Sequence, residues 1–199
     1  MTIATPLPVR LSPADREALA EHFLALGPED RRLRFGALLS DEAILDMEQR
    51  IDFERDRLFA VADDELRLLG VVHVAFYKGK AELGLSVLPA ARGQGLGNAL
   101  FSRAVMHLRN RMVREVFVHC LTENGAMMHL ARKHRMRVEH EGPESDACLT
   151  LPLPTTDSVL AEWVHDQGAA FAHAVRRNTL TARNLLSLMA PGATLARRN

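Results

Sequence analysis

A short glycine-rich segment is the part of this sequence with the clearest capacity for chemistry. Gly93, Gly95 and Gly97 alternate after Arg92, between a strand-like apolar run at 83–88 and a stretch with helical periodicity. Without Cβ atoms in the way, the backbone N–H groups of such a turn can converge, and the following helix adds the positive end of its dipole. The segment therefore predicts a cradle for an anion such as a phosphate or pyrophosphate.

Two common nucleotide-binding motifs are excluded by the residues around these glycines. A P-loop needs Lys-Ser or Lys-Thr after its last glycine, and no such pair follows any glycine here. The dinucleotide fingerprint needs a third glycine where this chain has Asn98, and an acidic residue about twenty positions later. The strand-like run at 115–121 ends in Cys120 and Leu121 instead.

The remaining pattern resembles the acetyl-CoA-binding signature of the GNAT (GCN5-related N-acetyltransferase) superfamily, written (Q/R)-x-x-G-x-(G/A). Arg92, Gly95 and Gly97 occupy its fixed positions. A second segment is similar to the family's N-x-x-(A/M)-x-x-L-Y-x-K-x-G-F pattern. Its matching residues are Asn124, Met127, Leu130 and Lys133. The resemblance spans roughly residues 4–153.

The resemblance implies acetyl-CoA as co-substrate, without a metal. The coenzyme's pyrophosphate would lie in the loop, and its pantetheine arm along a strand edge left open where two parallel strands splay apart. The residues implied are Leu85, Ser86 and Val87 on the strand, Arg92, Gly93, Gln94, Gly95, Leu96, Gly97 and Asn98 in the loop, and Asn124. For Asn124, an ordinary helix N-cap is the alternative.

Transfer to an amine needs a base, because a lysine-type ammonium has a pKa near ~10.4 and no lone pair. Glu82 is the candidate, since some GNAT enzymes carry a general-base Glu in the corresponding Ala-Glu context; a surface Glu at a strand end is the alternative. The backbone N–H of Val87 could stabilise the oxyanion.

The general acid stays open, because the family's tyrosine is replaced by Ala131. A thiol pKa near ~8.5 makes the departing thiolate a tolerable leaving group without one. The conceivable substitutes are His119, Cys120, His129 and His134.

Two functions fit these observations. The first is an N-acetyltransferase in which a primary amine attacks acetyl-CoA directly in a ternary complex. The second is a non-catalytic acyl-CoA-binding sensor or interaction module. The acceptor is a small-molecule amine or a protein lysine; the segment 28–35 loosely resembles the start of GNAT domains in bacterial protein-lysine acetyltransferases. Its arginines, Arg31, Arg32 and Arg34, form either a solvated helix face or part of the acceptor site.

Composition agrees with a soluble cytoplasmic protein. The 199 residues carry 25 basic and 25 acidic side chains, so nucleic acid is not an expected partner. Cys120 and Cys148 lack metal-type spacing and suit a reducing compartment. No stretch approaches the ~18 apolar residues of a membrane span, and no signal peptide is evident.

The elements predict an α/β (α+β) fold with a mixed, mostly antiparallel central sheet, splayed at the acetyl-CoA site and flanked by helices. Strands are expected at 5–11, 57–62, 66–77, 83–88, 116–122, 137–140 and 147–153, and helices at 12–26, 41–50, after the glycine loop and after Asn124.

The domain is expected to span 1–153, and a C-terminal helical extension 154–199. Apolar residues at helical spacing predict two amphipathic helices there, one from Leu160 to Val175 and one from Leu180 to Met189, ended by Pro191-Gly192. The extension could pack on the domain or form a homodimer.

Overall fold

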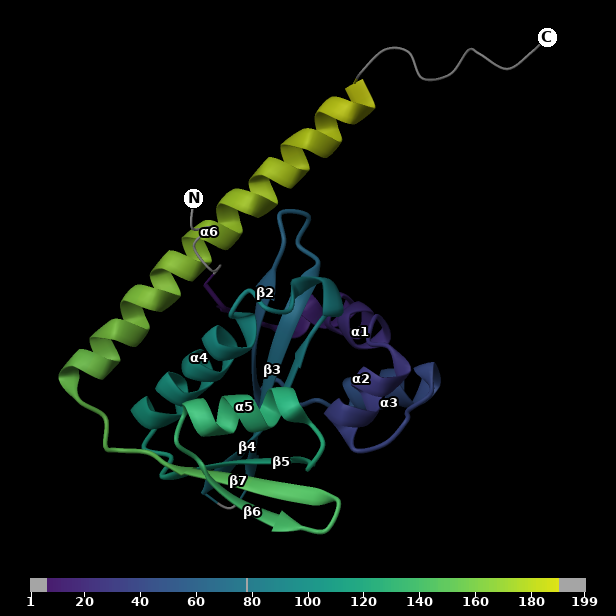
Figure 1. The fold of residues 1–199 in the computed structure, drawn as a ribbon. Helices are drawn as coiled ribbons and strands as arrows, with labels where there is room; N and C mark the ends of the chain where they lie inside the picture. The colour runs from purple at the N-terminus through teal and green to yellow at the C-terminus, as the bar shows by residue number, and fades with distance from the viewer. Residues whose placement is uncertain (1–6, 78, 190–199) are drawn as a thin grey trace.

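The computed structural model describes residues 7–77 and 79–189. Within these residues, seven strands form one sheet in the order β1-β2-β3-β4-β5-β7-β6 (Figure 1). The strands are β1 (Val9–Arg10), β2 (Arg57–Ala62), β3 (Leu68–Tyr77), β4 (Lys80–Val87), β5 (Glu115–Leu121), β6 (Arg137–Glu141) and β7 (Glu144–Thr150). Only β4 and β5 pair in parallel among them, so the predicted mixed, mostly antiparallel sheet is confirmed.

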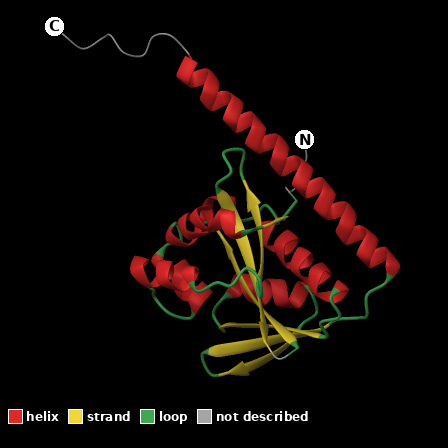
Figure 2. Cartoon of the chain, turned by 180° about the vertical axis from the view of Figure 1, so that it is seen from behind, coloured by secondary structure: helices red, strands yellow, loops and turns green. Residues whose placement is uncertain are grey.

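Helices cover both faces of the sheet (Figures 1 and 2). They are α1 (Arg16–Leu24), α2 (Pro28–Phe35), α3 (Asp41–Gln49), α4 (Leu96–Asn110), α5 (Gly125–Lys133) and α6 (Thr156–Met189), with short 3₁₀ turns at Pro13–Asp15 and Pro89–Ala91. Side chains alternate across β2, so Phe59 and Val61 join the core under α4 and α5, whereas Leu58 and Ala60 join the core under α1 and α3.

The charged segment at 29–34 belongs to helix α2, and a proline and a glycine define the two ends of this helix. Pro28 stands in its first turn, where a missing N–H costs nothing, and Gly36 ends it with φ 74°, a left-handed conformation. Arg31 clamps the preceding turn by donating to the backbone oxygens of Leu24 and Leu26. The helix is therefore fixed against α1, and its last turn faces the sheet.

The parallel pair β4–β5 is short. Register positions pair Lys80 with Glu115 and Glu82 with Phe117, and no pairing is formed beyond Glu82 in the described strands. From there β4 continues with β3 as its neighbour up to Val87, while β5 continues with β7. The two strands therefore splay apart towards the glycine loop, as the family resemblance implied.

The first strand is shorter than the predicted 5–11. Val9 and Arg10 pair with β2, and Leu11 donates to the oxygen of Leu58 at 2.9 Å, but the pairing begins only after Pro8. Proline has no N–H to give to a ladder, which explains the late start. Residues 5 and 6 of that prediction lie outside the described part of the chain.

The prediction of two helices in the C-terminal extension is wrong, because α6 runs without a break from Thr156 to Met189. Thr179, between the two apolar stretches, and Thr181, near the start of the second, donate their hydroxyls to the oxygens of the residues four positions earlier, at 2.9 and 3.0 Å. Such back-bonding keeps threonine compatible with a helix. Pro191-Gly192 lies outside the described residues.

One ionic cluster attaches α6 to the domain. Glu162 accepts hydrogen bonds from Arg103 at 3.1 Å, from His107 at 2.9 Å and from Asn110 at 2.8 Å, all on α4. Further along the helix, Ala169 is buried and Arg176 forms an ion pair with Asp64 at 3.7 Å. The last turns of the helix project past the rest of the molecule (Figures 1 and 2). The boundary between a domain at 1–153 and an extension at 154–199 stays a prediction.

None of the helices in the described ranges combines the length and apolar character needed to cross a membrane. The same ranges contain no group of three or more His, Cys, Asp or Glu side chains arranged to hold a metal ion.

Candidate active site

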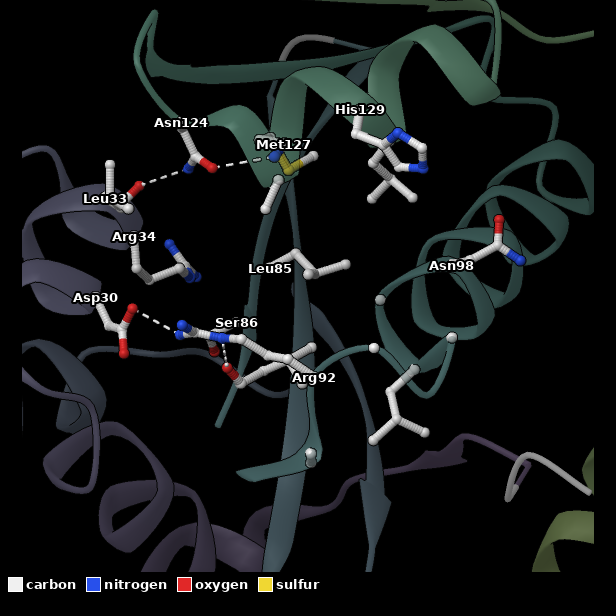
Figure 3. Close-up of a pocket in the computed structure, with 18 of the residues that line it drawn as sticks. Asp30, Leu33, Arg34, Leu85, Ser86, Arg92, Asn98, Asn124, Met127 and His129 are labelled. Carbon is white, nitrogen blue, oxygen red and sulfur yellow. Dashed lines mark hydrogen bonds and ion pairs between the residues drawn. The ribbon is translucent and has the colours of Figure 1, made fainter. Parts of the chain in front are cut away.

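Two cavities meet over the open end of the splay. The first, about 520 Å³, lies between the glycine loop, β4, α2 and α5 (Figure 3). The second, about 280 Å³, lies on the side of β5, β7 and the end of α2. Of the residues predicted to hold the coenzyme, those that line the first cavity are Leu85, Ser86, Val87, Arg92, Gly93, Gly95, Leu96, Gly97, Asn98 and Asn124.

The glycine loop has the backbone that an anion cradle needs. Gly93 and Gly95 adopt φ values of 76° and 79°, a region that other residues rarely enter. Gly95 is also the N-cap of α4 and provides no side-chain cap. The N–H groups of Leu96, Gly97 and Asn98 belong to the first turn of α4, where a helix supplies no acceptors, and these residues line the cavity.

The backbone of β4 presents a free edge to the first cavity. Backbone groups of an antiparallel strand point alternately to its two sides. Leu88 donates to the oxygen of Leu69 at 2.8 Å, so even-numbered residues bond towards β3. Leu85 and Val87 therefore direct their N–H and C=O groups to the side that β5 has left. Ser86 directs its backbone groups to β3 and belongs to the cavity wall.

The side chain of Ser86 makes a buried hydrogen bond that the sequence did not reveal. His22 on α1 donates from Nδ1 to the oxygen of Leu68 at 2.8 Å, so its Nε2 accepts from the Ser86 hydroxyl, also at 2.8 Å. Burial, together with the nearby charge of Arg34, lowers the pKa of His22 to about 4. His22 is thus neutral and ties the middle of β4 to α1.

The side chains of Arg92 and Gln94 form hydrogen bonds to other residues of the protein. Arg92 forms an ion pair with Asp30 of α2 at 2.6 Å and donates from Nε to the oxygen of Val87 at 3.1 Å. Gln94 donates to the oxygen of Ala90 at 3.4 Å and does not line either cavity. Arg92 therefore closes the cavity against α2 (Figure 3).

Asn124 is an N-cap, which was one of its two predicted roles. Its Oδ1 accepts from the N–H of Met127 at 3.0 Å, and its Nδ2 donates to the oxygen of Leu33 at 3.3 Å (Figure 3). The side chain therefore holds the start of α5 against α2, at the point where the two cavities meet. A contact with the coenzyme stays a prediction.

The second cavity contains the predicted base. Glu82 and His119 both line it, on the two strands that splay. His119 donates to Asp146 at 2.7 Å, and this bond raises the pKa of His119 above its usual value. Glu144 lines the same cavity, so its wall carries two carboxylates, together with the guanidinium of Arg34. Carboxylates suit the positive charge of an amine.

The other candidate acids are poorly placed or engaged. Cys120 lines the second cavity, but burial raises the pKa of its thiol. His134 bonds to the Oδ1 of Asn98 at 3.1 Å and packs against Phe101, so it positions the loop. His129 lies in the first cavity, on the exposed side of α5. Ala131 is fully buried and supplies no hydroxyl.

The model of the acetyltransferase (GNAT) family matches residues 29–135, which is more than half of the chain. The chain belongs to the GNAT acetyltransferase family. A search of curated protein sequences finds no match.

Solved structures agree with this GNAT assignment at the level of fold. The GNAT domain of S. lividans PAT is 19% identical, with a TM-score of 0.60 over 72% of this chain and 88% of that one. Spermidine N-acetyltransferase from Vibrio cholerae, in complex with CoA and spermine, is 17% identical, with a TM-score of 0.59 over 74% and 96%. The ribosomal-protein-S18-alanine N-acetyltransferase from Escherichia coli is 18% identical, with a TM-score of 0.55 over 75% and 96%.

The residues of this GNAT protein fit the coenzyme that the family uses. The cradle has free helix N–H groups, and the edge of β4 has the spacing that amides of an extended ligand require. The sequence did not single out Asp30, Leu33 or His22, because none belongs to a motif. These residues reach the site through packing of α1 and α2 on the sheet.

Proposed function

We propose that this protein is an N-acetyltransferase that moves the acetyl group of acetyl-CoA to a primary amine by direct attack in a ternary complex. The observation that carries the proposal is the meeting of two cavities across the splay of β4 and β5. One cavity has an anion cradle, and the other has carboxylates. A thioester held along β4 would point from the first cavity into the second.

In this arrangement the N–H groups of the loop and of the first turn of α4 bind the diphosphate of coenzyme A, which is the charge their dipoles favour. The backbone groups of Leu85 and the N–H of Val87 pair with the amides of the pantetheine arm, while the oxygen of Val87 accepts from Arg92. Arg92 orients the loop through Asp30 and adds positive charge beside it. Lys133 of α5, on the rim of the same cavity, adds a second cation.

Glu82 acts as the base in this proposal. It removes a proton from the bound ammonium, and the neutral amine then attacks the thioester carbon. The thiolate of CoA leaves, and solvent protonates it, since Ala131 stands where the family has a tyrosine. The acidic wall formed by Glu82 and Glu144 attracts the positively charged acceptor before it loses its proton.

The acceptor belongs to one of two classes. The V. cholerae and E. coli structures are those of a spermidine acetyltransferase and a ribosomal-protein-alanine acetyltransferase. The second cavity, about 280 Å³, has room for the end of a polyamine or the side chain of a lysine. Both ligands present an alkyl-ammonium group to the same carboxylates.

The alternative is a non-catalytic acyl-CoA-binding sensor or interaction module. The buried Ala131 at the tyrosine position favours this alternative. Both functions require the coenzyme to bind, and they differ in what Glu82 does. Turnover that is lost when Glu82 is replaced would support the acetyltransferase over the non-catalytic sensor.

A homodimer through α6 is a further part of the proposal. An apolar row on the exposed face of this helix consists of Leu160, Val164, Phe171, Val175 and Leu186. Its members are spaced so that they share one face of a straight helix. The charges reverse along the helix, from Asp157 at the start to Arg177 and Arg183 near the end. An antiparallel second copy would bury the row and set opposite charges against each other.

A place in the cytoplasm agrees with the two free cysteines and with the supply of acetyl-CoA there.

Two measurements test the function. Calorimetry on the folded protein should detect binding of CoA and acetyl-CoA. Release of free thiol from acetyl-CoA should then require an amine from a panel of polyamines, amino acids and lysine-containing peptides. Absence of binding heat would overturn both functions, whereas binding without thiol release under any amine would favour the sensor.

A further inference from the structure

The two cavities share a small set of wall residues, and an acyl group that passes from one cavity to the other must pass these residues. The shared residues are Leu33, Arg34, Leu85, Asn124 and Met127. They form the junction between the two cavities. The present inference rests on the proposed acetyl transfer, because that reaction places the thioester carbonyl at this junction.

Only one side chain of the junction has hydrogen-bond donors to spare. Three of its members are apolar. Asn124 uses its Oδ1 for Met127 and its Nδ2 for Leu33. Arg34 remains: its Nε is buried without a hydrogen-bond partner, and its guanidinium forms no ion pair within the described chain.

The guanidinium of Arg34 is held in place by packing. A Cβ atom on Gly84 would lie 2.3 Å from Nη2 and 2.4 Å from Cζ and Nη1, so the group lies flat against the bare backbone of β4. The Phe35 and Phe23 rings lie 5.0 and 6.0 Å from Cζ. Figure 3 shows the side chain reaching from α2 into the space beside Leu85 and Ser86.

The charge of Arg34 is retained at neutral pH. Burial lowers the pKa of its guanidinium to about 10, and the carboxylate of Glu82 acts in the opposite direction. The group is therefore a cation in a place where water screens little. A cation without a partner is costly to bury, and the cost is offset when negative charge develops beside it.

We propose that Arg34 is a catalytic residue that donates a hydrogen bond to the acyl carbonyl oxygen of the bound thioester and stabilises the oxyanion. The amine nitrogen forms a bond to the carbonyl carbon, and the carbonyl π electrons move to the oxygen facing Arg34. When this intermediate collapses, the carbon–sulfur bond breaks and the thiolate leaves; Glu82 already holds the proton of the ammonium, so the second proton of the amine goes to solvent. Val87, whose N–H the sequence suggested for this task, lines only the first cavity.

The first test observes the carbonyl directly and needs no acceptor. In acetyl-CoA labelled with ¹³C at the carbonyl, a hydrogen bond from a guanidinium moves the carbonyl resonance downfield. Wild-type protein should show this shift on binding, and Arg34→Met should lose it while CoA itself binds as before. Arg32→Met is the matched control, because Arg32 lies on the same helix, pairs with Glu29 and Glu123, and lines neither cavity.

A second variant moves the guanidinium without removing it. Gly84→Ala places a Cβ inside the position of the Arg34 guanidinium, which is the far end of a flexible side chain and can shift at low cost. Gly84 lies in a regular strand, so alanine is compatible with its backbone. This variant should lose the carbonyl shift as well, and in the Arg34→Met background it should change nothing further.

Turnover provides the kinetic counterpart. Loss of one oxyanion donor lowers kcat by roughly 10²-fold, and we expect this loss in Arg34→Met, with a partial loss in Arg34→Lys. An unchanged carbonyl resonance in Arg34→Met would overturn the proposal. A loss of turnover confined to amines that carry a carboxylate would also overturn it, because Arg34 would then bind the acceptor and not the oxyanion. Failure of the wild-type protein to bind acetyl-CoA would instead overturn the proposed function, so the two failures are distinguishable.

Discussion

The hydroxyl of Ser86 donates a 2.8 Å hydrogen bond to Nε2 of His22, and this bond joins β4 to α1 beneath the candidate coenzyme site. Because Nδ1 of His22 is engaged with the oxygen of Leu68, the ring has no place for a second proton without losing the bond to Ser86. The rigidity of the wall of the first cavity thus depends on a neutral histidine.

A pH dependence of stability follows from His22. Its pKa is about 4 in the folded protein against an ordinary value of 6.5, so between these values the unfolded chain holds the extra proton. Stability therefore falls as the pH drops from 6.5 to about 4, by up to ~3 kcal/mol from this group alone. Urea denaturation across this range should show the loss, and His22→Gln should remove that part of it. His129→Gln, at an exposed position, should keep the wild-type slope.

Coenzyme binding should depend on Gly95. Glutamate there adds a carboxylate to the anion cradle and forces a side chain into φ 79°. We expect Gly95→Glu to weaken CoA binding by roughly 10²-fold, the equivalent of ~3 kcal/mol, measured by calorimetry. Gly79→Glu is a matched control, since Gly79 has φ 80° and lies in the turn at the opposite end of β4. Equal affinity for CoA in both variants would contradict a phosphate site at the loop.

The role of Glu82 should appear in turnover and not in coenzyme affinity, because Glu82 lines only the second cavity. Glu82→Gln should lower the rate of thiol release by roughly 10²-fold or more, as expected when a general base is removed. Glu139→Gln, on the exposed strand β6, serves as a control for the loss of a negative charge. If Glu82→Gln turns over acetyl-CoA at the wild-type rate, another group or a water chain takes the proton.

The attachment of α6 should depend on Glu162. Burial opposes its ionisation, but hydrogen bonds from His107 and Asn110 and the charge of Arg103 outweigh burial and lower the pKa of Glu162 to about 2. Glu162→Gln leaves the buried Arg103 with Asp166 as its remaining carboxylate, and losing the charged hydrogen bonds to Glu162 costs ~2 kcal/mol in unfolding free energy. Denaturant titration measures this loss, and Asp157→Asn, on the exposed first turn of α6, should be close to neutral. An equal effect of both variants would rule out a specific role for the cluster.

The proposed dimer predicts a concentration-dependent mass. Light scattering should give twice the monomer mass for the wild-type protein, and Phe171→Glu should give the monomer, because it places a charge at the middle of the apolar row. Ala170→Glu changes charge equally at a neighbouring exposed position outside that row and should keep the dimer. A monomeric wild-type protein would end this part of the proposal.

The sequence alone determined the glycine loop, the strand before it and the helix after it. Alternating glycines and the helical periodicity that follows are local signals, since the backbone conformation they permit depends on neighbours in the chain. The splay of β4 and β5 was predicted only through the family resemblance. Glu82 and Asn124 were identified in the same way; both line the second cavity, and their roles as base and coenzyme contact stay predictions.

Only the tertiary structure decided which charged side chains face the site. Arg31, Arg32 and Arg34 follow one another on α2, yet Arg31 clamps the end of α1, Arg32 pairs with carboxylates in solvent, and Arg34 enters the junction. Their positions differ by rotation around the helix and by where its last turn meets β4, and no local pattern encodes that contact. The sequence pattern likewise did not reveal that α6 runs without a break. Whether threonine interrupts a helix depends on the carbonyl its hydroxyl can reach, and that is settled in three dimensions.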